Sequence, residues 1–162
     1  MLKKYLVLFL FFTFYYLNSQ KTVPNVPIET FKSTYTTMNK ELDEEKFYIL
    51  SFWATWCVPC INELDALNEV YDELSDKLNF KVLAISTDDS RTKRRVRPLV
   101  NGKSWKFDVL LDENHDLKRA LNISGLPHTI IAKQNEILHR RVGYAPGEEL
   151  DLLEKLKEYE VE

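Results

Sequence analysis

The two cysteines of this 162-residue chain lie three positions apart, in Trp56-Cys57-Val58-Pro59-Cys60. A disulfide stabilises a fold mainly by closing a long loop, and a bond between these two would close almost none. Such a bond would be easy to reduce, so the spacing favours a redox pair over a structural staple.

The chemistry of such a pair depends on where each sulfur lies. We expect Cys57 at the amino end of a helix, where the backbone amides favour the thiolate, the form that attacks disulfides. Cys60, one turn later, could then attack the mixed disulfide, release the partner in reduced form and leave the pair oxidised.

A zinc site is the main alternative use of two cysteines. It would need two more ligands, but His115, His128 and His139 are 13 and 11 residues apart and there is no second cysteine pair. We therefore expect no metal and no cofactor besides the Cys57-Cys60 disulfide.

A strand and a helix must hold these sulfurs. Residues 47–54 form an almost continuous apolar run, which predicts a strand covered on both faces of a sheet. Pro59 is tolerated in a first helical turn, where the amides have no partner to lose. Apolar residues then recur at steps of three and four, which predicts a long amphipathic helix: Ile61, Leu64, Leu67, Val70, Tyr71, Leu74 and Leu78.

The remaining patterns predict an α/β fold, a mixed sheet with helices on both faces. Phe80–Ser86 reads as a second buried strand, parallel to the first because a helix separates them. We expect further strands at 28–31, 33–37, 107–111, in the segment ending at 132, and at 137–142, with a hairpin turn at Gln134-Asn135. Further helices are expected at 38–45, at 91–100 (capped by Asp88, Asp89 or Ser90, disturbed by Pro98, stopped by Asn101-Gly102), at 115–121 and at 148–159.

The first twenty residues follow the plan of a secretory signal. Two lysines precede about 13 mostly apolar residues and a small polar exit. That run is short against the roughly 20 residues that span a bilayer, so we expect cleavage rather than permanent anchoring. The prediction is a signal peptide at 1–20, one domain at 21–162, and an exported, periplasmic or extracytoplasmic location.

Charge gives no argument for binding nucleic acid. The chain has 22 basic and 25 acidic residues, and loss of Lys3 and Lys4 with the signal leaves 20 against 25, a net charge of −5. Residues 91–106 hold seven basic residues and no acid. We interpret this segment as a solvated face, with docking of an acidic partner as the alternative.

The stretch Phe52-Trp53-Ala54-Thr55-Trp56-Cys57-Val58-Pro59-Cys60 resembles the active site of the thioredoxin superfamily. With the N-terminal signal and the extra segment 90–121, the chain is similar to the TlpA/ResA branch of exported thiol–disulfide oxidoreductases over residues 28–159. The resemblance implies a thioredoxin-like fold, Cys57 as nucleophile, Cys60 as resolving thiol, and Pro127 of Gly125-Leu126-Pro127 as a cis-proline beside them.

Glu63 follows Cys60 by three residues, so both lie on one side of the helix and the carboxylate could exchange protons with the thiols. The alternative is an ordinary solvated helix acid. The resemblance favours the functional interpretation, since the TlpA/ResA branch has Glu at the matching position. Thioredoxin itself places a buried Asp on the central strand, where this chain has Ser51.

Four residues are expected to flank the sulfurs and bind the partner: Trp56, Pro59, Leu126 and His128. His128 is equally well explained as a polar residue that opens a strand. For Phe52 and Trp53 we favour packing.

We expect a monomeric enzyme that reduces disulfides of exported proteins, and the resemblance implies cytochrome c maturation as a candidate pathway. A membrane thiol reductant of the DsbD/CcdA type would then recharge it. Disulfide formation and a non-catalytic binding or chaperone-like module remain alternatives. Peroxiredoxin chemistry is disfavoured, because no hydroxyl residue stands at or beside Trp53 and no proline at or beside Ile49.

Overall fold

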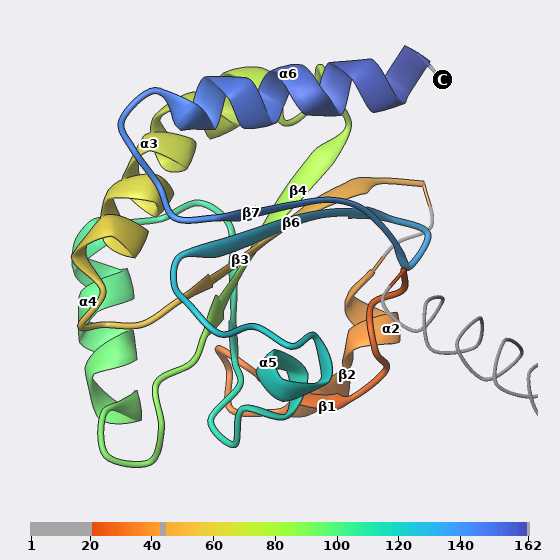
Figure 1. The fold of residues 1–162 in the computed structure, drawn as a ribbon. Helices are drawn as coiled ribbons and strands as arrows, with labels where there is room; N and C mark the ends of the chain where they lie inside the picture. Colours follow the sequence, from red (N-terminus) through yellow and green to blue (C-terminus); the bar gives the residue numbers. More distant parts are fainter. Residues whose placement is uncertain (1–20, 43–44, 162) are drawn as a thin grey trace, which may run out of the picture.

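The computed structural model describes residues 21–42 and 45–161, and the expected signal peptide at 1–20 lies outside them. One seven-stranded mixed sheet forms the centre of the molecule, with strand order β2-β1-β5-β4-β3-β6-β7 (Figure 1). The strands are β1 Pro27–Thr30, β2 Tyr35–Thr37, β3 Phe47–Trp53, β4 Phe80–Ser86, β5 Asp108–Leu111, β6 His128–Lys133 and β7 Glu136–Val142. The predicted parallel pairing of β3 with β4 and antiparallel pairing of β6 with β7 are both confirmed.

Helices cover both faces of this sheet, as the sequence predicts (Figure 1). They are α2 Met38–Glu41, α3 Val58–Leu74, α4 Val96–Lys103, α5 Asp116–Ala120 and α6 Glu148–Val161, with a short 3-10 turn at Lys93–Arg95. Residues of α3, α4 and α6 pack into one apolar cluster and residues of α2 and α5 into another. The architecture is thioredoxin-like.

Strand β3 separates the two clusters. Ile49 and Trp53 pack with α3, whereas Leu50 and Phe52 pack on the opposite face. Every residue of β3 is buried, which confirms the strand covered on both faces and the packing roles of Phe52 and Trp53. The strand thus carries the chain through the core to the cysteine pair.

The prediction for the segment after β4 is wrong in detail. Helix α4 begins at Val96 rather than 91. Asp88 binds Thr55, and Asp89 accepts from the Arg91 amide at 3.0 Å in a turn that leads into the short 3-10 helix before α4. Pro98 then falls in the first turn, where no amide is needed, and does not disturb the helix. The helix also continues through Asn101-Gly102 and ends where Ser104 adopts a left-handed conformation.

The segment after β4 returns to the polar side of α3. The Trp105 indole N–H donates to Asp65 at 2.9 Å, and Lys103 forms an ion pair with the same carboxylate. Asn68 accepts a backbone bond from Lys106 at 2.8 Å. The inserted segment therefore braces the helix that follows the cysteines.

Across the described ranges 21–42 and 45–161, no helix combines the length and apolar character needed to cross a membrane.

Candidate active site

Cys57 and Cys60 form a disulfide at the start of α3, with their Cα atoms 5.3 Å apart. Cys57 is the N-cap residue of the helix, and Pro59 lies in the first turn as predicted. The Cys57 amide donates to the Ala54 carbonyl at 3.0 Å, and the Cys57 carbonyl accepts from Ile61 at 3.1 Å. The strand-to-helix corner therefore presents the first cysteine and buries the second.

Exposure differs between the two cysteines. Cys57 is 5% exposed and Cys60 is 0% exposed, so the expected access to Cys57 is limited to a small area. Around it lie exposed apolar side chains: Trp56 is 61% exposed and Val58 66%, and Pro59 is also exposed. A partner that covers these side chains would meet Cys57 before Cys60.

The peptide bond between Leu126 and Pro127 is cis, as the resemblance implies. Leu126 is half-buried and packs against both apolar clusters, while Pro127 is buried. The Pro127 carbonyl accepts the Gly143 amide at 2.8 Å, which ties this loop to the end of β7.

His128, one of the four residues predicted to bind the partner, is largely buried. It opens β6, as the alternative interpretation has it, and is only 7% exposed. It pairs across the sheet with Phe52, and the two rings meet edge to face with centroids 6.5 Å apart. Because neighbouring strand residues alternate between faces, its side chain lies on the face opposite to Thr129, which contacts α3 through Glu63.

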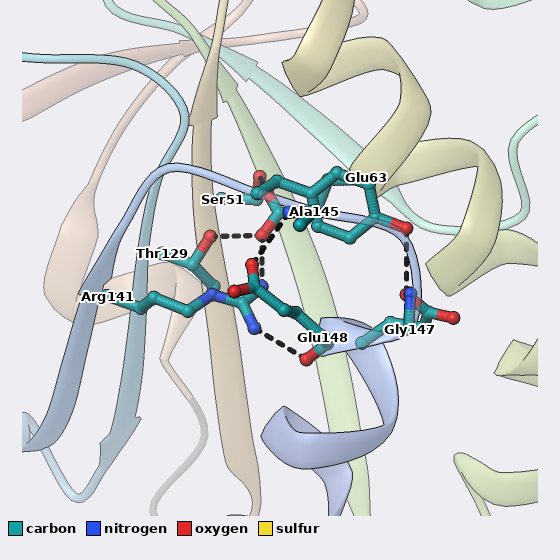
Figure 2. Close-up of polar contacts among 9 residues, drawn as sticks. Ser51, Glu63, Thr129, Arg141, Ala145, Gly147 and Glu148 are labelled. Atoms are coloured by element: carbon teal, nitrogen blue, oxygen red, sulfur yellow. Dashed lines mark hydrogen bonds and ion pairs between the residues drawn. The ribbon is translucent and has the colours of Figure 1, made fainter.

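Glu63 is fully buried, so the interpretation as a solvated helix acid is wrong. Its Oε2 accepts from the Ser51 hydroxyl at 3.0 Å, and its Oε1 accepts from Thr129 at 2.8 Å and from Arg141 at 2.7 Å (Figure 2). The helix carboxylate thus lies against Ser51 of the central strand, the position where thioredoxin is expected to carry its own buried acid.

The three donors to Glu63 are cross-strand neighbours in the sheet. Ser51 pairs with Thr129, and Thr129 with Arg141, so β3, β6 and β7 each present one donor on the same face. The sequence analysis missed Thr129 and Arg141, because only the strand register brings them together. The sequence of β7 contains one indication. Arg140 and Arg141 are adjacent within this strand, and adjacent side chains of a strand point to opposite faces, so the two arginines must point to different faces of the sheet.

Arg141 also reaches the start of α6. It donates to the Glu148 carbonyl at 2.5 Å and lies over the ring of Tyr144, 6.0 Å from its centroid. The Tyr144 hydroxyl donates to Glu149 at 2.7 Å. Burial, followed by this bond to a carboxylate, raises the pKa of Tyr144 to about 12.

A second buried carboxylate, Asp88, follows the carboxyl end of β4. It accepts from the Thr55 amide at 2.8 Å, the Thr55 hydroxyl at 2.6 Å and the Ser86 hydroxyl at 2.9 Å. Thr55 precedes Cys57 by two residues, so Asp88 fixes the loop between β3 and the cysteine pair. The sequence analysis treated Asp88 only as a possible helix cap. Its place after a parallel strand is the signal that could have identified it.

The basic residues of 91–106 are largely paired within the molecule. Lys93 contacts Glu29 at 2.5 Å and Glu113 at 2.7 Å, and Arg91 contacts Asp89 at 2.6 Å. Arg94 and Arg95 are exposed. This agrees with the solvated-face interpretation and leaves docking of an acidic partner untested.

Comparison with known proteins gives the chain its relatives. A family model described as the AhpC/TSA family matches residues 20–141. The thiol-disulfide oxidoreductase ResA of Bacillus thuringiensis (strain Al Hakam) is 29% identical over 107 residues, which cover 65% of this chain and 60% of that protein. The chain thus spans less than two thirds of that relative's length.

Solved structures show the same fold. A thioredoxin-like protein from Porphyromonas gingivalis is 35% identical, with a TM-score of 0.75 over 87% of this chain and 93% of that one. StoA from Bacillus subtilis is 20% identical, with a TM-score of 0.66 over 83% of this chain and 98% of that one.

Proposed function

Because this chain belongs to the AhpC/TSA family of thioredoxin-like proteins, we propose that it is a thiol–disulfide oxidoreductase that reduces disulfides in other exported proteins. One observation carries the proposal: the Cys57–Cys60 disulfide lies in the first turn of α3, with the first cysteine slightly exposed and the second enclosed.

The reaction starts from the reduced pair. The Cys57 thiolate attacks one sulfur of a partner disulfide, and the other partner sulfur leaves as a thiolate. Cys60 then loses its proton and attacks Cys57, which releases the second partner sulfur. Two electrons pass to the partner, which takes up two protons, and the enzyme is left with the Cys57–Cys60 disulfide.

Glu63 is the proposed proton partner of Cys60. Both residues are fully buried and lie three positions apart on α3, so a proton that leaves Cys60 has little direct access to water. Pro127 is the proposed cis-proline of the catalytic site. Trp56, Pro59 and Leu126 are the proposed contacts of the partner protein around Cys57. The burial of His128 gives no support to its place in this set.

The cycle requires a reductant. We place the enzyme outside the cytoplasm, with a membrane thiol reductant of the DsbD/CcdA type as electron donor and cytochrome c maturation as the pathway. These assignments are supported by the resemblance to the TlpA/ResA branch, whereas the name of the ResA relative supports the thiol–disulfide oxidoreductase activity alone.

Two cysteine variants test the activity. Cys57→Ser should abolish catalysed reduction of a disulfide-bonded protein, because it removes the nucleophile. Cys60→Ala should accumulate mixed disulfides through Cys57, visible by non-reducing electrophoresis of exported proteins. If Cys57→Ser loses this reduction but still restores the function of the protein in cells, the binding or chaperone-like alternative is favoured, and absence of any trapped partner would indicate an inert pair.

The direction of electron flow is tested by equilibrating the pair with glutathione buffers. A reductase should have a potential below about −180 mV, the range of protein disulfide isomerase. A value near −120 mV, the range of a strong oxidant, would reverse the proposed direction.

A further inference from the structure

The buried Glu63 carboxyl group contacts a cation, Arg141, that has no role in the reaction proposed above. Arg141 donates to Oε1 at 2.7 Å, and the exposed fractions of the two side chains are 16% for Arg141 and 0% for Glu63. An arginine stays protonated and can only donate, so Glu63 is the acceptor of this contact and has a positive charge beside its carboxyl group. A buried ionised group needs such compensation to be tolerated.

We propose that Arg141 is a positioning residue of the redox site, which balances the charge of Glu63 and thereby sets the pH at which Cys60 becomes a thiolate. The inference rests on the proposed oxidoreductase function and extends it to a residue on β7, far from the cysteines in sequence.

The physical link is the charge felt by Cys60. Cys60 and Glu63 lie three positions apart on α3, both fully buried, where water screens charges weakly. An uncompensated Glu63 carboxylate would oppose formation of a Cys60 thiolate. An uncompensated Arg141 guanidinium would favour it, and in the observed ion pair the two charges act on Cys60 in opposite directions.

Tyr144, His139 and Glu149 lie near Arg141, and the pKa shift of each moves its titration away from the range of pH 7 to 9. The pKa of Tyr144 is raised to about 12 by burial and by Glu149. Burial, with Lys155 and Arg141 nearby, lowers the pKa of His139 from its ordinary 6.5, so this ring is neutral in that range. Burial would raise the pKa of Glu149, but the hydrogen bonds from Tyr144 and from backbone amides, with the charge of Arg141, together lower it. Changes in that range therefore report the thiols.

The experiment measures the step in which Cys60 attacks the mixed disulfide. A mixed disulfide between Cys57 and glutathione is prepared, and the rate at which Cys60 displaces glutathione is measured against pH. Arg141→Met should move the midpoint of this profile upward by about one pH unit, a roughly tenfold slower rate at neutral pH. Glu63→Gln should move the midpoint downward, and the double variant should return towards the wild type.

Opposite signs distinguish charge balance from a purely structural role, because a loosened fold would move both single variants alike. Arg141→Lys should keep the wild-type midpoint. Arg140→Met is the matched control: Arg140 is the next residue on β7 and donates to the Leu121 carbonyl, on the opposite face. It should leave the midpoint unchanged.

Circular dichroism and thermal unfolding establish that each variant is folded. If Arg141→Met does not fold, Arg141→Gln replaces it with the same expected shift. Midpoints of the Arg141 and Glu63 variants that equal the wild type, or that shift in the same direction, would overturn the inference. Failure of the wild type to turn over disulfides would instead overturn the proposed function.

Discussion

Two buried carboxylates near the cysteine pair, Glu63 and Asp88, accept hydrogen bonds from different kinds of donor. Glu63 on α3 is 0% exposed and has a cation, Arg141, as one of its three donors. Asp88 after β4 is 2% exposed, and among the described residues its carboxylate is bonded by the neutral donors of Thr55 and Ser86. One site contains an ion pair, and the other contains an anion bound by dipoles.

This difference in donors indicates that Asp88 and Glu63 have different roles. Asp88 accepts from the backbone amide two residues before Cys57, so it organises the loop that leads to the cysteine pair. Among the residues that the structure describes, Glu63 accepts from three side chains and from no backbone amide. It therefore contributes charge beside Cys60 rather than backbone geometry beside Cys57.

Removing Glu63 should have the largest effect on stability. Glu63→Ala leaves Arg141 as a buried cation without its carboxylate and takes an acceptor from Ser51 and Thr129. Breaking a buried ion pair in this way costs about 3–5 kcal/mol. Urea unfolding of the oxidised protein measures the change in the free energy of unfolding. A loss as small as that at an exposed pair would show that the cation of this pocket is solvated after all.

Asp88→Asn should cost less, because no cation is stranded. The amide can accept through one oxygen only, so either the Thr55 or the Ser86 contacts are lost, at about 1–3 kcal/mol. Hydrogen exchange at the Thr55 amide should become faster, while exchange in α6 should not change. Unaltered protection at Thr55 would contradict the role of Asp88 in organising this loop.

His128 extends the comparison to a buried ionisable group whose ring nitrogens have no hydrogen-bond partner among the described residues. Burial, followed by the charge of Arg140, lowers its pKa below 6.5. A lowered folded-state pKa contributes stability that is complete above pH 6.5 and is lost as pH falls, by at most about 1.4 kcal/mol per pH unit. His128→Leu should reduce this acid sensitivity in denaturation measured from pH 7 to 5, and an unchanged slope would contradict it.

Tyr144 should give the smallest effect, on the alkaline side. Its pKa is raised from 10.0 to about 12 by burial and by its bond to Glu149. A raised folded-state pKa contributes stability that is complete below pH 10 and is lost as pH rises towards 12. Tyr144→Phe should flatten the stability profile over this interval, measured by thermal unfolding. Identical profiles would show that the phenol is no better shielded than in the unfolded chain.

Much of the fold could be predicted from local patterns. The apolar run of β3, the helical spacing of α3 and the turn at Gln134-Asn135 each depend on near neighbours in sequence, and each lies where expected. The start of α4 was mispredicted because Asp88 offers its oxygens equally well to a helix cap and to a distant loop. Only the tertiary structure decides between them.

The candidate site divides in the same manner. Cys57, Cys60 and Pro59 are close in sequence, and their arrangement in the first turn follows from that closeness. The donors to Glu63 come from β3, β6 and β7, and Thr129 is 66 residues away and Arg141 78. No spacing rule reaches so far, because the alignment of three strands depends on the whole sheet.

The contacts from Trp105, Lys103 and Lys106 to the outer side of α3 have a consequence for protein engineering. Segment 90–121 supplies an indole, an ammonium group and a main-chain donor to Asp65 and Asn68, in the two helical turns after Cys60. A shortened version without this segment would leave those polar side chains facing water and uncover the apolar wall under the helix. The smallest folded unit of this protein therefore includes the insertion, whose strand β5 also lies between β1 and β4 in the sheet.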